Sequence, residues 1–101
     1  MMTIDFKSGR ITYNEFHINF NLPFSEQEDC LTEDLLQVEY ENGYLIDLGW
    51  YPEYDETGKF ILQLISNGNW EKPIYKKQSR NWEHLKKSLI KAIDMANVGI
   101  N

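Results

Sequence analysis

Residues that could carry covalent or metal chemistry are few and scattered in this sequence. The histidines are His17 and His84, the cysteine is Cys30, and no CxxC or HExxH pattern surrounds any of them. A zinc site is therefore not predicted, because zinc ligands come at short characteristic spacings. Cys30 sits between acids in SEQEDCLTED, and nearby carboxylates raise the pKa of a thiol. We expect an ordinary free thiol and neither a metal nor a cofactor.

Catalytic groups of other kinds are equally hard to find. The glycines that could form a phosphate loop instead lie in or beside expected hairpin turns, where they serve the turn geometry: Gly43, Gly49, Gly58 and Gly68. A serine or cysteine nucleophile needs a positioned base, and nothing here indicates one. Glu39 and Asp47 share a predicted sheet face and could form an acid/base pair, but solvated acids on a sheet are common. We therefore do not expect an enzyme.

The stretch LGWYPEYDETGKF, residues 48–60, places three large aromatic side chains among three acids. Trp50 continues the inward alternation of the preceding strand, so we expect it in the core. Tyr51 and Tyr54 follow that strand around Pro52, where burial is harder. A tyrosine among carboxylates is typical of a protein interface, because the ring supplies contact area and the acids steer a basic partner. The competing interpretation is a hairpin turn closed by Gly58.

The interface interpretation predicts a partner-binding set that joins this loop to the acids of the neighbouring sheet face. Its members are Glu39, Asp47, Tyr51, Glu53, Tyr54, Asp55 and Glu56.

Charge is distributed very unevenly along the chain. No Lys or Arg occurs from Ile11 to Gly58, a stretch that holds 12 acids, whereas eight bases and three acids follow from Lys59 onward. The formal net charge is −6, which argues against a nucleic-acid partner. The two halves could cancel when they fold together. If they do not, the acidic half favours encounter with a basic partner.

At 101 residues the chain has the size of one domain. The 42% hydrophobic content with interspersed charges indicates a folded globular protein. No apolar run approaches the roughly 18 residues that span a bilayer, and MMTIDFKSGR lacks the apolar core of a signal peptide. We therefore expect a cytoplasmic protein with no membrane association.

The pattern in the first third of the chain predicts a short hairpin and a separate strand. Ile4 and Phe6, followed by Ser8-Gly9 and then Ile11 and Tyr13, suggest a short hairpin. Apolar residues then alternate with polar ones over residues 16–22, which predicts a half-buried strand ending at Pro23. Residues 25–34 are polar and could form a loop or a helical turn capped by Ser25.

The central region predicts a hairpin whose register follows from its apolar pattern. A loop of Asn42 and Gly43 alone would mix acids into the apolar face. A three-residue loop, 41–43, with Gly43 in the left-handed conformation, sets Tyr40 opposite Tyr44 and Val38 opposite Ile46. The other face then carries Gln37, Glu39, Leu45 and Asp47, which we expect to be solvated or to face a partner.

The last 40 or so residues complete the predicted fold. KFILQLIS reads as a further strand, and NWEKPIYKKQ as an extended piece that Pro73 restricts to a sheet edge. From Asn81 onward, apolar residues recur every three to four positions, which predicts an amphipathic helix capped by Ser79 or Asn81. The expected class is α+β: an antiparallel β-sheet meander with a C-terminal α-helix packed on one face.

The run from Tyr44 to Ala96 resembles the immunity proteins of contact-dependent growth inhibition and related polymorphic toxin systems. The resemblance lies in the GWYPE step after an alternating strand, the Gly-closed turn, NGNWEKP and the terminal NWEHLKKSLIKAIDMA helix. It covers about half of the chain, and it transfers no catalytic residue. It implies a cytoplasmic protein that binds a cognate toxin domain, often a basic nuclease, and blocks its active site or substrate path.

Two further functions are compatible with the sequence. The chain could be a small accessory or regulatory subunit that binds a protein unrelated to toxins, or a hydrolase that uses Glu39 and Asp47. A reading frame for a variable toxin domain beside the gene favours the immunity protein, and a metabolic operon favours the accessory subunit.

Overall fold

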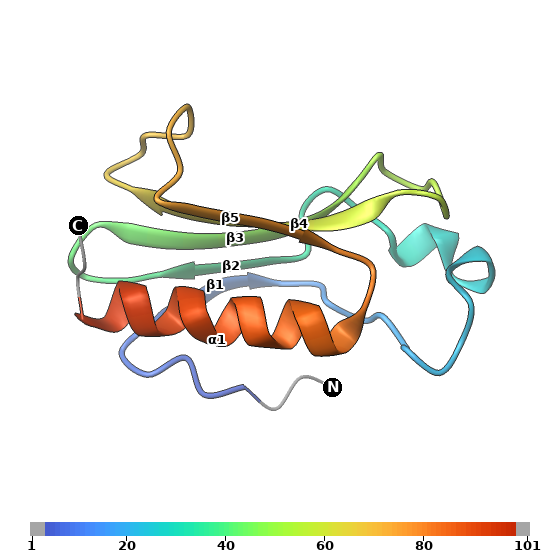
Figure 1. Cartoon of the computed structure of the whole chain (residues 1–101), viewed down its shortest axis with the longest axis horizontal. Coiled ribbons are helices and arrows are strands. Elements are labelled where there is room, and N and C mark those ends of the chain that lie inside the picture. The colour runs from blue at the N-terminus through green and yellow to red at the C-terminus, as the bar shows by residue number, and fades with distance from the viewer. Residues whose placement is uncertain (1–3, 99–101) are drawn as a thin grey trace.

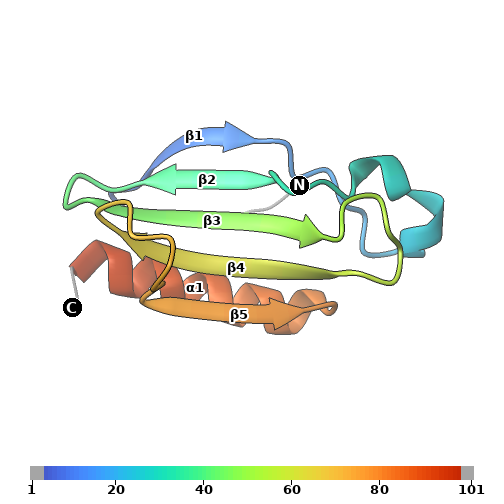
Figure 2. The same ribbon diagram turned by 90° about the horizontal axis from the view of Figure 1, so that it is seen from above.

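The computed structural model describes residues 4–98. A five-stranded antiparallel sheet in the order β1-β2-β3-β4-β5 carries one helix on one of its faces (Figures 1 and 2). The predicted α+β meander is therefore confirmed. The elements are β1 (Arg10–Asn14), β2 (Leu36–Glu39), β3 (Tyr44–Tyr51), β4 (Lys59–Ser66), β5 (Tyr75–Ser79) and α1 (Trp82–Val98), with 3₁₀ turns η1 (Phe24–Glu26) and η2 (Glu28–Cys30) between β1 and β2.

The β2–β3 hairpin has the register that the apolar pattern predicts. Val38 pairs with Ile46, and the backbone N–H of Tyr40 donates to the carbonyl of Tyr44 at 2.8 Å. Gly43 has a φ of 89°, a left-handed conformation that favours glycine. The apolar face of β2 and β3 is thereby fixed toward the helix.

The core lies between this face of the sheet and α1 (Figure 1). Its strand residues alternate along β2, β3 and β4: Val38, Ile46, Leu48, Trp50, Phe60, Leu62 and Leu64. Its helix residues recur at three and four positions: Leu85, Leu89, Ala92, Ile93 and Ala96. Asn81 caps the helix, because its side-chain Oδ1 accepts the backbone N–H of His84 at 3.2 Å. The opposite face of the sheet, here called the open face, carries no helix among residues 4–98 (Figure 1).

The hairpin predicted over residues 4–13 is wrong. Residues 4–9 form no strand, and Gly9 N–H closes a turn on the carbonyl of Phe6. Ile11 pairs instead with Val38 on β2, and the hydroxyl of Tyr40 donates to the carbonyl of Phe6 at 3.0 Å. The apolar spacing of this segment serves core packing, whereas its strand partner comes from elsewhere in the chain.

The strand predicted over residues 16–22 is also wrong. Phe16 and Ile18 are buried as the alternation requires, but the segment belongs to no β-ladder. The side chain of Gln27 takes the place of a strand partner, since it accepts the N–H of Asn19 at 2.9 Å and donates to the carbonyl of the same residue at 2.8 Å. The alternation of apolar and polar residues therefore indicates here which side chains are buried, although the segment is not part of a sheet. Of the two possibilities for residues 25–34, short helical turns are the one observed. Ser25 does not cap the first turn, because Pro23 occupies its N-cap position and makes no side-chain capping bond.

Candidate functional site: the acidic end

Two acidic segments meet beyond the strand ends at one end of the sheet (Figure 2). They are residues 24–34 and the β3–β4 loop, residues 52–58, and together we call them the acidic end. The backbone N–H of Tyr54 donates to the carbonyl of Leu31 at 2.7 Å, and that of Trp50 donates to the carbonyl of Thr32 at 2.8 Å. Two stretches about 20 residues apart thus form one surface.

Negative charge dominates this surface. The first segment holds five acids, the second holds three, and neither contains a Lys or Arg. All of these acids are exposed except Asp55, which is half-buried. Within residues 4–98, side-chain ion pairs join Arg10 to Glu39 and His17 to Glu15, so no lysine of the second half pairs with the acidic end. The sequence left open whether the bases of the second half cancel these acids, and ion pairs that would do so are not among those of residues 4–98.

Tyr54 lies between Glu53 and Asp55 in the β3–β4 loop. Its side chain is 57% exposed, and its φ of 63° is a left-handed conformation that costs energy for a side chain of this size. Tyr51 is half-buried, and its hydroxyl donates to the carbonyl of Glu33 at 3.3 Å. Tyr54 is therefore available to a partner, while Tyr51 ties the loop to the neighbouring segment.

The three loop acids differ in what they contact. Glu53 Oε1 accepts the backbone N–H of Glu33 at 3.2 Å. Asp55 Oδ1 accepts the backbone N–H and the hydroxyl of Thr57 at 2.8 and 2.6 Å, and these bonds, together with nearby Arg80, lower the pKa of Asp55. Glu56 is exposed. Asp55 thus shapes the turn, whereas Glu53 and Glu56 present charge to solvent.

Arg80 is a residue of this site that the sequence did not indicate. Its Nη1 donates to the backbone carbonyls of Glu56, at 3.1 Å, and of Gly58. The guanidinium lies over the rings of Phe24 and Trp50, at 5.0 and 5.6 Å from their centroids. One cation from beyond β5 thereby holds both segments of the acidic end. No sequence signal marks it, because its polar partners are backbone carbonyls.

Glu39 and Asp47 lie on the open face rather than at the acidic end. Glu39 pairs with Arg10 at 3.3 Å. Asp47 is only 3% exposed, so the expectation that it is solvated is wrong. Its Oδ1 accepts a hydrogen bond from Gln37 Nε2 at 2.9 Å. Burial raises the pKa of Asp47, the charge of Asp34 adds to the rise, and the bond from Gln37 opposes it.

The remaining chemical groups form no clustered centre in the described part of the chain. Among residues 4–98, no group of three or more His, Cys, Asp or Glu side chains is placed to hold a metal ion. Cys30 is half-buried, and burial first and Asp29 second raise the pKa of its thiol, in the direction expected from its acidic neighbours. No helix within these residues is long and apolar enough to cross a membrane.

Comparison of the chain with family models, with curated proteins and with solved structures yields no significant match.

Proposed function

We propose that this chain is an immunity protein that binds a cognate bacterial toxin domain, a basic nuclease, through its acidic end and blocks the active site or substrate path of that domain. The observation that carries the proposal is the exposed Tyr54 at the centre of two segments full of acids, none of which is paired with a base in residues 4–98. The sequence resemblance described above supports the same partner class.

A basic nucleic-acid cleft is the natural complement of this surface. Nucleases bind a polyanion through Lys and Arg side chains, and a cluster of exposed carboxylates offers those side chains an alternative set of anionic partners. Long-range attraction would speed the encounter. Tyr54 would supply the desolvated contact that resists dissociation, since tyrosine is enriched among residues that dominate binding energy.

The predicted contact residues have different roles in this proposal. Glu53, Tyr54 and Glu56 contact the toxin directly, while Tyr51 and Asp55 hold the loop in place. Glu39 and Asp47 belong to the open face. Glu39 is contacted only if the toxin domain is large enough to extend onto that face. The buried Asp47 makes no direct contact and acts through the shape and the electrostatic field of the open face.

A charge-reversal experiment tests the acidic end. Where the neighbouring reading frame encodes a toxin domain, that domain is the probe, and the measured quantity is its association rate with Glu53→Lys/Glu56→Lys. We expect a fall of roughly tenfold or more, because rim charges act mainly on association. Glu41→Lys/Glu71→Lys is the matched control, since both acids are exposed and lie in turns at the other end of the sheet (Figure 2).

Equal rates for the two double variants would remove the acidic end from the interface. Absence of binding by the unaltered protein to that toxin domain would remove the immunity assignment and favour an accessory subunit.

A further inference from the structure

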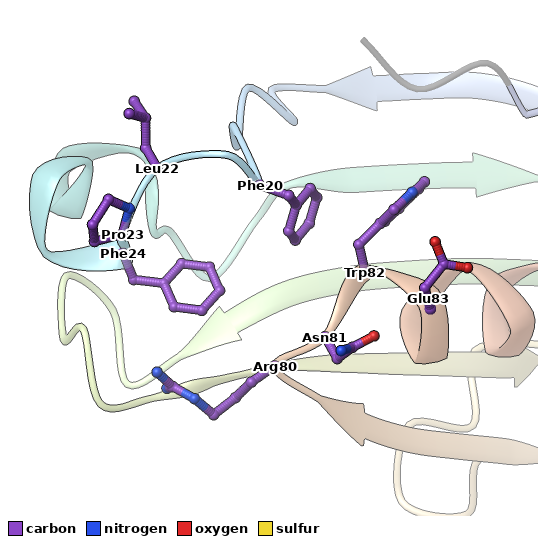
Figure 3. A pocket seen from close by; sticks show the side chains of 8 residues that line it. All are labelled: Phe20, Leu22, Pro23, Phe24, Arg80, Asn81, Trp82 and Glu83. Atoms are coloured by element: carbon purple, nitrogen blue, oxygen red, sulfur yellow. The ribbon is translucent and has the colours of Figure 1, made fainter.

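A shallow groove of about 340 Å³ borders the acidic end. Figure 3 shows the rings of Phe20, Phe24 and Trp82 spaced around it, with Arg80 on one side and Glu83 on the other. Leu22 also borders the groove but points away from the rings (Figure 3). The volume falls at the lower end of the range typical of ligand pockets, about 300–1,000 Å³.

The aromatic walls are held in place from behind. Phe20 stacks on Trp82 with a centroid separation of 5.2 Å, and Phe24 lies 4.7 Å from Trp50. All three lining rings are half-buried and packed against the core. Each ring therefore packs one side against the core and exposes part of its surface in the groove. The groove is thus preformed in the protein without a partner.

The groove and the acidic end are one continuous surface. Phe24 is both a wall of the groove and the first residue of η1. Arg80 borders the groove and donates to the carbonyls of Glu56 and Gly58 in the acidic loop. A partner seated on the carboxylates is thereby brought to the aromatic rings.

The charged residues around the groove determine which kind of side chain it can bind favourably. Glu83 borders it, and the exposed Glu26 follows Phe24 by two residues. Arg80, the cation at this site, is already engaged by two carbonyls and two rings. An acidic occupant would face carboxylates, whereas an aromatic ring flanked by bases would meet rings within and carboxylates at the border.

We propose that the groove receives one aromatic side chain that the basic partner projects between Lys or Arg residues. This inference rests on the proposed function, because it assigns the anchor of the same interface. The carboxylates attract the partner, and the groove determines which aromatic-bearing basic segment stays bound.

Two synthetic peptides separate these contributions. One carries a tryptophan flanked on both sides by arginines, and its twin carries glycine in place of the tryptophan. Each is titrated into ¹⁵N-labelled protein, and amide and indole shifts are recorded. We expect both peptides to shift the amides of the acidic end, and the tryptophan peptide alone to shift Phe20, Phe24 and the Trp82 indole. Its affinity should be higher by roughly tenfold, the gain that aromatic pairing and ring burial can provide.

Two variants with matched controls locate the effect. Phe20→Leu keeps apolar volume but removes a ring from the groove, and Phe6→Leu is its control because Phe6 is also half-buried against the core. Glu83→Gln removes a border charge without disturbing the core, and Asp94→Asn is its control on the same helix. We expect the Phe20 and Glu83 variants alone to lower the affinity for the tryptophan peptide, by at least about threefold.

The outcomes distinguish the inference from the function on which it rests. Equal affinity of the two peptides, or tryptophan-dependent shifts confined to residues 52–58, overturns the groove as an anchor and leaves the acidic end intact. Failure of both peptides to bind overturns the proposed preference for a basic partner and the groove with it. If Phe20→Leu does not fold, the comparison of Glu83→Gln with Asp94→Asn and the chemical shifts of the unaltered protein still test the groove.

Discussion

At the scale of single residues, Tyr54 combines exposure with an unfavourable backbone conformation. Its φ of 63° suits glycine far better than a residue with a Cβ. A side chain that is 57% exposed gains little from packing in return. This combination is typical of residues held for contact with a partner rather than for stability.

Replacing Tyr54 by glycine should therefore separate stability from binding. We expect Tyr54→Gly to raise the free energy of unfolding by about 1 kcal/mol, because glycine adopts this φ without steric cost, while binding to the toxin weakens by about 2 kcal/mol. Urea unfolding and binding titration measure the two quantities. Tyr54→Ala is the control, since it removes the ring but keeps a Cβ. A glycine variant less stable than the alanine variant would contradict the strain argument.

The raised pKa of the buried Asp47 carboxyl should make the stability of the protein depend on pH. Its folded-state pKa is raised above the ordinary value of 3.8, so the folded state binds the proton more tightly than the unfolded state does. The contribution of Asp47 to the free energy of unfolding consequently falls as the pH rises from 3.8 through the folded-state pKa. At neutral pH the buried carboxylate destabilises the fold.

Asp47→Asn should raise the free energy of unfolding at neutral pH, because the amide keeps an oxygen that can accept from Gln37 and carries no charge. The gain should shrink as pH falls toward 3.8, which urea unfolding over a pH series measures. Glu39→Gln is the control, since Glu39 lies on the same face but is exposed, and we expect little change from it. Equal stability of Asp47→Asn and the unaltered protein at every pH would refute this assignment.

At the scale of elements, the position of the acidic segment depends on a close approach of two backbones. A Cβ added to Gly49 on β3 would overlap the carbonyl oxygen of Glu33. Nearby, Leu35 N–H donates to the carbonyl of Leu48 at 3.0 Å. Residues 31–35 can therefore run beside β3 only because position 49 has no side chain.

Gly49→Ala should destabilise the protein by about 3 kcal/mol, since backbone must move to admit the methyl group. We further expect faster hydrogen exchange in residues 31–35, which lose their bonds to β3. Gly68→Ala is a useful comparison, because a Cβ there meets no atom within 4 Å and only the φ of 74° opposes it. A smaller loss at position 49 than at position 68 would argue against the close approach.

Arg80 joins the acidic loop to the entry of α1. Arg80→Leu should lower the free energy of unfolding by about 2 kcal/mol, because two carbonyls lose their donor and two rings lose the stacked cation. Hydrogen exchange in residues 52–58 should increase at the same time. Lys87→Leu is the control on an exposed site of α1. Unchanged exchange in the loop would show that Arg80 does not hold it.

The elements that could be predicted are those whose pattern and partner are both local. The β2–β3 hairpin and α1 follow from alternation, a glycine turn and helical spacing over adjacent residues. The strand prediction for residues 16–22 is wrong, because Gln27 rather than a strand satisfies the backbone of Asn19. Alternation alone does not distinguish these two ways of burying every second side chain.

At the scale of the whole molecule, eight acids gather at one end of the sheet, where Lys59 begins β4 and Arg80 follows β5. The acids of residues 24–34 and 52–58 gather beyond the strand ends (Figure 2), whereas Lys76 and Lys77 lie on β5 and Lys86, Lys87 and Lys91 on α1. Such a distribution orients an approaching basic domain before contact.

Salt should therefore act on association more than on dissociation. Raising the ionic strength from about 0.01 M to about 1 M shortens the screening length from roughly 30 Å to 3 Å. We expect the association rate with the basic toxin domain to fall by at least roughly tenfold, and the dissociation rate to change much less. Stopped-flow fluorescence measures both rates. An association rate that does not depend on salt would contradict electrostatic steering.

The absence of Lys and Arg from Ile11 to Gly58 made about half of the chain strongly acidic before folding, and local periodicity indicated a meander with one helix. Folding decided where those acids lie. The bonds from Tyr54 to Leu31 and from Trp50 to Thr32 join backbone groups, and the Arg80 guanidinium donates to the backbone carbonyl of Glu56. Because the acceptors are backbone carbonyls, which every residue has, their side chains could not indicate these contacts. Asp47 was buried for a related reason: its neighbours across the sheet, and not its own chemistry, determine how much water reaches it.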